Sequence, residues 1–229
     1  MIPKKRLHPK EIKKILDLLK VLQSLDHPNI IKYNHFFEDD NNIYILLELN
    51  NAISFNDYLK KENNIGNIEI KNYILQLIKG LQYLHNNKIM HRNLKLDNIY
   101  LTNNKELKIG DFDLAVKLNF EGEKRKSIKG TPLYMAPELL KEKEYSYEID
   151  IWSLGVIIYA IFIGKTPFET NHFNELLRKV KRMDYSFPKN KIIDDDAKDL
   201  INKILVEVPA KRLTLDKILE HKFFKKDQL

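Results

Sequence analysis

The sequence of 229 residues contains no cysteine. Without thiols the chain has no disulfide framework, no cysteine-ligated zinc and no thiol nucleophile, which excludes disulfide-rich scaffolds, most zinc modules and thiol enzymes. The first ten residues are basic at Lys4, Lys5 and Arg6 but lack the apolar run of a secretory signal. We therefore expect an intracellular protein, cytoplasmic or nuclear.

Glycine is scarce and long apolar runs are missing. Seven glycines are present, whereas average usage of about 7% predicts roughly sixteen. The most apolar stretch, from Ile151 to Ile163, is shorter than the roughly 18 residues that a membrane span requires, so it predicts a buried helix and no membrane span. The sequence contains no internal repeat.

Charge and hydrophobicity describe a globular protein. The chain carries 39 basic and 32 acidic residues, for a net charge of +7. An excess of this size is typical of a solvated surface, and we expect no direct nucleic-acid partner. With 43% hydrophobic residues, the chain is long enough for one sizeable core or two small ones.

The N-terminal fifth predicts one helix followed by a hairpin. From Pro9 to Leu25 the apolar residues recur at the spacing of one helical face, and residues 27–29 end the pattern. Residues 30–37 and 43–49 are rich in aromatic and β-branched side chains, and the polar stretch between them predicts the turn. Because two strands alone are marginal, they must pack on something else.

The remainder of the chain is mainly helical in pattern. Ser54 is a candidate cap for a short helix, and residues 68–85 predict a longer one. Two short strands are expected at 99–101 and 107–109. Further helices are expected at 147–163, 173–182, 195–206 and 215–220. We interpret the pattern as a small mixed lobe packed on a larger helical lobe.

Several polar clusters follow the long helix in a fixed order. They are His91-Arg92-Asn93-Leu94-Lys95-Leu96-Asp97-Asn98, Asp111-Phe112-Asp113, Gly130-Thr131-Pro132, Met135-Ala136-Pro137-Glu138, Asp150-Ile151-Trp152-Ser153-Leu154-Gly155 and a late Arg212. In order and spacing they resemble the signature set of Ser/Thr protein kinases. The segments most similar to polo-like kinases are Phe36–Asp39, Lys108–Phe112, Gly164–Thr170 and Glu220–Phe224.

This resemblance implies an α+β, bilobal protein-kinase fold. The implied domains are a partial N-lobe at 1–49, with one helix and about two strands, and a complete, mainly helical C-lobe at 50–229. The implied activity is transfer of phosphate from ATP to a protein substrate with the help of Mg²⁺. The implied partners are protein substrates or other proteins, and the oligomeric state stays open.

The resemblance also implies roles for the residues of the cleft. Asp111 and Asn98 match the family's Mg²⁺ ligands and offer the hard oxygens that this ion prefers. Lys95 matches the lysine beside the transferring phosphate. Glu48 and Asn50 fall in the segment that resembles the adenine-binding hinge.

Structural and regulatory roles are implied for a second group. Arg92 matches the receiver of an activation-segment phosphate, for which Ser127 is the aligned candidate, although an exposed Ser in a basic loop needs no function. Thr131 matches a contact to the catalytic loop. The implied scaffold consists of packing between His91 and Phe112, an ion pair between Glu138 and Arg212, and hydrogen bonds from the catalytic loop to Asp150.

Three positions depart from the family pattern. Asn93 stands where the family has its catalytic Asp, and an amide cannot accept the proton of the substrate hydroxyl. Leu18 stands at the position of the helix glutamate, and the neighbouring Asp17 would point about 100° away around the helix. Asp113 replaces a glycine, so that it either weakens metal binding or points to solvent.

These departures leave three interpretations open. By resemblance, residues 1–4 align directly after the lysine-bearing strand, so we expect the Gly-rich loop and the phosphate lysine to be absent from this sequence. We expect the same of the polo boxes, which would follow the kinase domain, because the sequence ends at Leu229. The first interpretation is a pseudokinase or very weak kinase that acts as an interaction module. The second is an active Ser/Thr kinase whose N-terminal part is missing from this sequence, and the third is a degenerate fragment that folds poorly.

Overall fold

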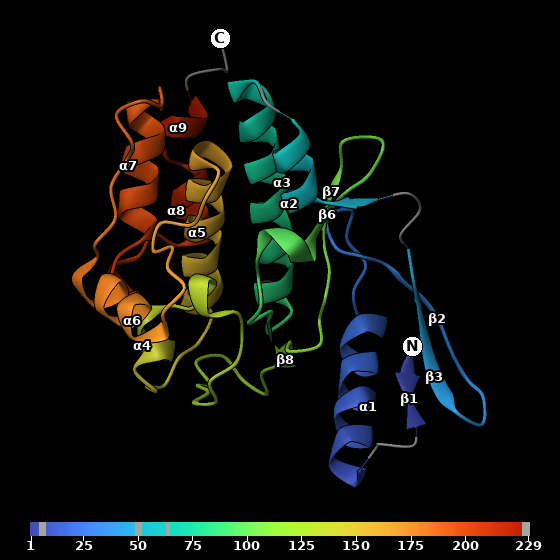
Figure 1. Ribbon diagram of the computed structural model, residues 1–229. Coiled ribbons are helices and arrows are strands. Elements are labelled where there is room, and N and C mark those ends of the chain that lie inside the picture. Colours follow the sequence, from blue (N-terminus) through green and yellow to red (C-terminus); the bar gives the residue numbers. More distant parts are fainter. Residues whose placement is uncertain (5–7, 49–51, 63–64, 226–229) are drawn as a thin grey trace.

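A small N-terminal lobe lies beside a larger, mainly helical lobe in the computed structural model (Figure 1). The structure describes residues 1–4, 8–48, 52–62 and 65–225. The element content is mixed α/β, with a small N-terminal lobe and a mainly helical C-terminal lobe, as the resemblance implied. The predicted boundary between residues 49 and 50 lies outside the described residues.

The small lobe consists of helix α1 (Pro9–Gln23) and three strands, β1 (Ile2–Pro3), β2 (Tyr33–Glu38) and β3 (Asn42–Leu47). The helix and the hairpin confirm the prediction. The strands form an antiparallel sheet in the order β1-β3-β2. The sequence predicted two strands, because β1 is two residues long and a periodicity cannot be read from two residues.

Helix α1 connects the two lobes because two of its faces are apolar. Ile15 and Leu19 pack with Ile43 of the small sheet and form a separate small core. Near the end of the helix, Val21 and Leu22 belong to the main core of the large lobe. The helix therefore shares apolar contacts with both parts of the molecule.

The large lobe begins with a short strand and a capped helix. The hydroxyl oxygen of Ser54 accepts a hydrogen bond from the backbone N–H of Asp57 at 3.0 Å, which confirms the predicted cap. The helices after α1 are α2 (Phe55–Lys61), α3 (Asn67–Asn86), α4 (Pro137–Leu140), α5 (Glu148–Ile163), α6 (Phe173–Arg182), α7 (Asp195–Ile204), α8 (Leu215–Leu219) and α9 (Lys222–Lys225). The further strands are β4 (Ile53–Ser54), β5 (Ile89–Met90), β6 (Ile99–Leu101), β7 (Leu107–Ile109) and β8 (Val116–Lys117).

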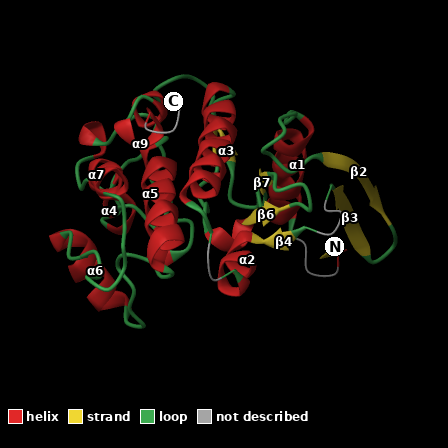
Figure 2. Cartoon of the chain, turned by 90° about the horizontal axis from the view of Figure 1, so that it is seen from above, coloured by secondary structure: helices red, strands yellow, loops and turns green. Residues whose placement is uncertain are grey.

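Helix α5 forms the centre of the large lobe. It is apolar on all sides, and nearly all its residues are buried. Figure 2 shows it between α3 and α7. The close approach of α7 depends on Gly155, where an added Cβ would lie 2.6 Å from the side chain of Ile204. Among the described residues, no helix has both the length and the apolar composition needed to cross a membrane.

Backbone hydrogen bonds also join the two lobes. The N–H of Ile31 donates to the carbonyl of Ile109 at 2.9 Å, and the N–H of Ile109 donates to the carbonyl of Asn29 at 2.9 Å. Strand β7, which contains Ile109, also pairs with β6 in the antiparallel sheet β4-β6-β7. The catalytic loop, residues 91–98, leads from β5 into β6. Because β6 pairs with β7, this loop lies close to the junction of the lobes.

Candidate functional site

A buried carboxylate on α5, that of Asp150, binds the backbone of the catalytic loop at its first two residues. Asp150 accepts hydrogen bonds from the backbone N–H groups of His91 and Arg92, both at 2.9 Å, and lies 3.1 Å from Nε2 of His85. Burial by itself raises the pKa of Asp150, but the hydrogen bonds and charges of His85 and His91 together outweigh burial and bring the pKa below its ordinary value. The arrangement matches the geometry that the resemblance implied for Asp150.

His91 is the first residue of the loop, and its side chain is fully buried. Its Nε2 lies 2.9 Å from the carbonyl oxygen of Gly110. Its ring packs edge to face on the ring of Phe112, with the two ring centroids 5.0 Å apart. Burial lowers the pKa of His91, which favours the neutral imidazole. The sequence placed this pair together as packing groups, and the structure brings them into contact.

Both ends of the Asn93 side chain are occupied. Its Oδ1 accepts a hydrogen bond from the hydroxyl of Thr131 at 3.0 Å, and its Nδ2 donates to Oδ2 of Asp111 at 3.3 Å. The amide therefore connects the activation segment, residues 114–138, to the carboxylate of Asp111. A carboxylate at position 93 would accept from Thr131 but would have no proton to offer Asp111.

Two side chains beside Asn93 carry oxygen atoms of the kind that bind a hard cation. Asn98 is buried, and its Nδ2 donates to the carbonyl oxygen of Asn93 at 2.8 Å, which leaves Oδ1 of Asn98 for another partner. Asp111 adds a carboxylate. Within the described part of the chain no three His, Cys, Asp or Glu residues form a metal-binding cluster. The donor set suits Mg²⁺, which is held by one or two protein oxygens together with phosphate and water.

Two further charged residues lie close to Asn93 and Asp111 in the sequence. Lys95 is half-buried, and no hydrogen bond or ion pair engages its ammonium group within the residues that the structure describes. Asp113 is exposed as a residue, although the surrounding protein still desolvates its carboxyl group. Desolvation and, secondarily, the charge of Asp111 raise the pKa of the Asp113 carboxyl group.

On the small-lobe side, helix α1 offers no acidic group toward the cleft at the family's position. Leu18 is half-buried and packs against the main core. The adjacent Asp17 is exposed and lies 3.8 Å from Lys20 on the outer face of the helix. The expectation that Asp17 points away is therefore confirmed.

The predicted hinge is described only in part, because Asn50 lies outside the described residues. The N–H of Glu48 donates to the carbonyl of Lys32 at 2.8 Å, and its carboxylate pairs with the buried Lys108 at 3.4 Å. Lys108 also donates to the carbonyl of Pro28 at 3.2 Å. The sequence analysis did not find this pair, because its members are 60 residues apart and only the fold brings them together.

The activation segment meets the catalytic loop at Arg92. Nη1 of Arg92 donates to the hydroxyl oxygens of Ser127 at 3.2 Å and of Tyr145 at 3.3 Å, and Nε donates to the carbonyl of Leu114 at 2.6 Å. The structure thus brings the aligned Ser127 to Arg92. Sequence reasoning missed Tyr145, since a lone tyrosine before a helix carries no signal.

A bidentate ion pair fixes the end of the activation segment. Nη1 and Nη2 of Arg212 donate to the two carboxylate oxygens of Glu138 at 2.7 and 2.6 Å. Both side chains are almost fully buried, and the guanidinium lies 5.0 Å above the ring of Trp152. This pairing is the one that the sequence implied.

The comparisons with known proteins agree with this geometry. The family model described as a protein kinase domain matches residues 1–224. The chain belongs to the protein kinase family. The signature residues therefore stand within a kinase domain. The curated proteins similar to this chain are Ser/Thr kinases, and polo-like kinases are among them.

Three relatives illustrate the similarity. A probable serine/threonine-protein kinase CCRP1 of Zea mays is 48% identical over 93% of this chain and 34% of its own length. A probable serine/threonine-protein kinase PLK of Dictyostelium discoideum is 45% identical over 98% of this chain and 23% of its own. The serine/threonine-protein kinase polo of Drosophila melanogaster is 40% identical over 90% of this chain and 36% of its own length. The chain spans about a third or less of the length of these relatives.

Proposed function

We propose that this polo-like kinase domain is a pseudokinase or a very weak kinase, and that it acts as a protein interaction module. The observation that carries the proposal is the side chain of Asn93. Its amide oxygen is engaged by Thr131 and its amide nitrogen by Asp111, and neither atom is basic enough to take a proton from a substrate hydroxyl.

The size of this loss supports weak or absent turnover. A general base typically contributes about 10² to 10⁴ in rate, or roughly 3 to 5 kcal/mol of transition-state stabilisation. The half-buried Leu18 adds to the loss, because it cannot form the ion pair that aligns a phosphate-binding lysine in active kinases. Two independent parts of the transfer machinery are thus changed.

Nucleotide binding is a separate part of the proposal. We propose that Asp111 and Asn98 would hold Mg²⁺ and that Lys95 would neutralise the phosphates, with Glu48 and Asn50 assigned to the adenine from the resemblance. When bound, Mg²⁺ would neutralise phosphate charge. Binding needs no proton transfer, so the change at Asn93 does not by itself prevent it.

The remaining residues would keep the domain folded and regulated. Ser127 is the proposed phosphorylation site opposite Arg92, and Thr131 connects the activation segment to the catalytic loop. The proposed scaffold consists of His91, Phe112, Glu138, Asp150 and Arg212. Because these residues join a continuous core, the chain is expected to unfold cooperatively, contrary to the degenerate-fragment interpretation.

A radiolabelled phosphotransfer assay with Mg-ATP tests the proposal. We expect turnover below about 0.1 s⁻¹, against roughly 1 to 100 s⁻¹ in active kinases. Asn93→Asp restores the base and is expected to raise any residual rate, whereas Asp111→Asn is the matched inactive control. Mg-dependent turnover of the unmodified chain above this limit would refute catalytic silence.

An active kinase in a longer chain is the second candidate. It is favoured by the retained Asp111, Asn98 and Lys95 and by relatives about three times as long as this chain. The discriminating step is to read the DNA upstream of Met1 for an in-frame Gly-rich loop and lysine strand, and to assay the longer product. Turnover above about 1 s⁻¹ with Asn93 in place would decide for this candidate.

Nucleotide binding is tested by thermal unfolding with Mg-ATP. Ligand that binds the native state alone raises the unfolding midpoint at saturation. We expect a rise for the unmodified chain and a smaller one for Asp111→Asn. Equal midpoints with and without Mg-ATP would mean that the cleft binds no nucleotide, while leaving the role of Asn93 unchanged.

A further inference from the structure

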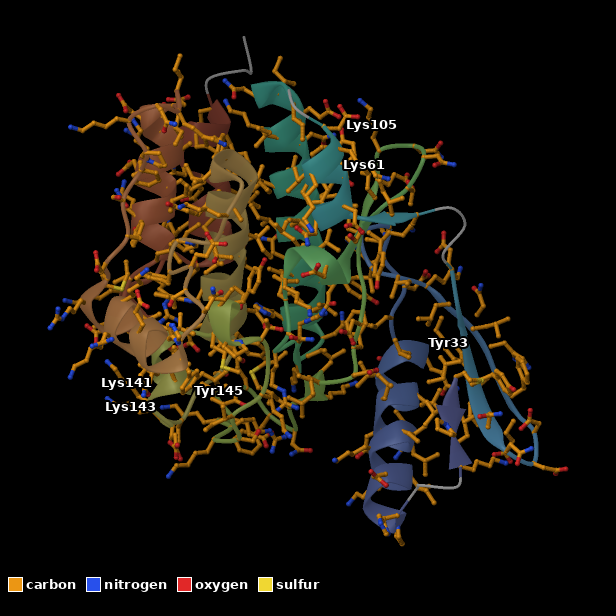
Figure 3. The ribbon with its side chains drawn as sticks, in the orientation of Figure 1. Tyr33, Lys61, Lys105, Lys141, Lys143 and Tyr145 are labelled. Carbon is orange, nitrogen blue, oxygen red and sulfur yellow. The ribbon has the colours of Figure 1, made fainter. Side chains whose placement is uncertain are left out.

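A tyrosine makes one of the attachments between the activation segment and the rest of the large lobe. Tyr145 lies on the connection between α4 and α5 (Figure 3) and is only 3% exposed. Its backbone pairs with that of Arg125 through two reciprocal N–H to carbonyl hydrogen bonds, each of 2.9 Å. A residue outside the segment thus forms a short antiparallel bridge with the segment.

The hydroxyl group of Tyr145 makes a second attachment. It donates to the carbonyl oxygen of Ser127 at 2.7 Å and lies 3.3 Å from the Ser127 hydroxyl. It also accepts from Nη1 of Arg92 at 3.3 Å, while the same nitrogen donates to the Ser127 hydroxyl at 3.2 Å. Ser127, Arg92 and Tyr145 therefore form a closed triangle of hydrogen bonds.

The charges around this triangle are unbalanced. In the part of the chain that the structure describes, no carboxylate pairs with the Arg92 guanidinium, whose recorded partners are two hydroxyl oxygens and the carbonyl of Leu114. Arg92 also has a left-handed backbone, with φ of 64°, a conformation that only surrounding contacts maintain. A phosphate on Ser127 would meet this cation directly.

We propose that Tyr145 is a positioning residue that takes the place of a phosphate, so that the activation segment is ordered while Ser127 is unmodified. Its hydroxyl supplies the acceptor for Arg92 and at the same time holds the Ser127 carbonyl. A phosphate on Ser127 would compete with Tyr145 for Arg92. Phosphorylation would therefore exchange one attachment for another and add little order. This inference does not depend on whether the domain transfers phosphate.

Hydrogen–deuterium exchange of the peptide covering residues 119–133 tests the role of the hydroxyl. Tyr145→Phe keeps the buried ring and removes only the oxygen. Because one or two hydrogen bonds control local opening, we expect exchange of this peptide to become about threefold to tenfold faster. Tyr147→Phe is the matched control, since no hydrogen bond to the Tyr147 hydroxyl is found among the described residues. We expect it to leave the rate unchanged.

A peptide from α7, residues 195–204, reports on global unfolding in the same experiment. An unchanged rate there shows that the variant is folded. Should Tyr145→Phe unfold the chain, Ser127→Ala provides the second variant. It removes one corner of the triangle at an exposed residue, and we expect it to accelerate exchange of the 119–133 peptide by less than about threefold.

The decisive comparison uses the chain with phosphoserine at position 127. In the unmodified background phosphoserine should change exchange of the 119–133 peptide by less than about twofold. In Tyr145→Phe it should return the rate to near the original value, because the phosphate binds the freed Arg92. Unchanged exchange in Tyr145→Phe, equal acceleration in Tyr147→Phe, or no recovery with phosphoserine would each overturn the proposal.

Discussion

The two sides of the catalytic loop differ in how far they keep the kinase pattern. On the side that faces α5, Asp150 and His91 stand at family positions and make buried hydrogen bonds. On the other side, Asn93 departs from the pattern, and so do Asp113 after β7 and Leu18 on α1. The residues that hold the loop are retained, whereas several that would act on a substrate are changed.

The physical reason is the cost of substitution. A buried charge such as Arg212 leaves its partner unpaired when it is lost, and the penalty falls on folding. A group at the cleft faces solvent or a ligand, so its exchange alters chemistry with little effect on stability. The comparison teaches that the requirements of the fold and of phosphoryl transfer can be separated within one loop.

Arg212→Ala is expected to have the largest effect. It leaves the carboxylate of Glu138 buried without its partner, and breaking such a pair costs about 3 to 5 kcal/mol of unfolding free energy. Urea unfolding measures the change. Lys217→Ala is the control, because it breaks an exposed pair with Glu220 and should not change the urea midpoint measurably. A loss below about 1 kcal/mol for Arg212→Ala would contradict the importance given to the scaffold.

Asp150→Asn is expected to cause the second largest loss of unfolding free energy. Hydrogen bonds to a charged group contribute about 1.5 to 3 kcal/mol, and the amide keeps one acceptor oxygen, so we expect a loss of about 2 kcal/mol near neutral pH. The loss should depend on pH. The folded pKa of Asp150 lies below its ordinary value of 3.8, so the ionised carboxylate stabilises the fold above pH 3.8. This stabilisation is lost as the pH falls through the lower, folded pKa.

Urea midpoints at pH 5, 4 and 3 check the pH dependence. The gap between the unmodified chain and Asp150→Asn should be largest at pH 5 and should close toward pH 3. A gap that grows as the pH falls would contradict the assigned direction of the pKa shift.

Leu18→Glu should have a smaller effect. Leu18 is half-buried against the main core, and replacing it with a charged side chain removes part of its apolar burial, at a cost of about 1 to 2 kcal/mol. Leu16→Glu on the same helix is the control, because Leu16 is 51% exposed. Thermal unfolding should show a lower midpoint for Leu18→Glu alone. Equal midpoints would mean that position 18 accepts the family glutamate without cost.

Asn93→Asp should have the smallest effect on stability. It replaces a hydrogen bond to Asp111 with repulsion between two carboxylates, at a cost of about 1 kcal/mol or less. Mg²⁺ should remove this cost, since a cation shields the two charges. Thermal midpoints with and without Mg²⁺ measure the effect, with the exposed Asn104→Asp as control. A Mg²⁺ response no larger in Asn93→Asp than in Asn104→Asp would argue against a cation site at Asp111.

Local patterns predicted most of the secondary structure. The Ser54 cap, the long helix α3 and the apolar helix α5 follow from residues near one another in the chain. Strand β1 was missed because two residues show no period, and it exists only because β3 offers it an edge. The pair between Glu48 and Lys108 was missed for a similar reason, since its members meet across the junction of the lobes.

The sequence by itself determined the family, the order of the catalytic motifs and the chemical identity of the changed residues. An amide at position 93 has no basic oxygen in any fold. Only the tertiary structure decided which groups those residues contact. That Asn93 joins Thr131 to Asp111, and that Tyr145 shares Arg92 with Ser127, depends on contacts between distant segments. Such contacts are set by how the helices and strands pack, whereas residue chemistry and local periodicity are properties of the chain alone.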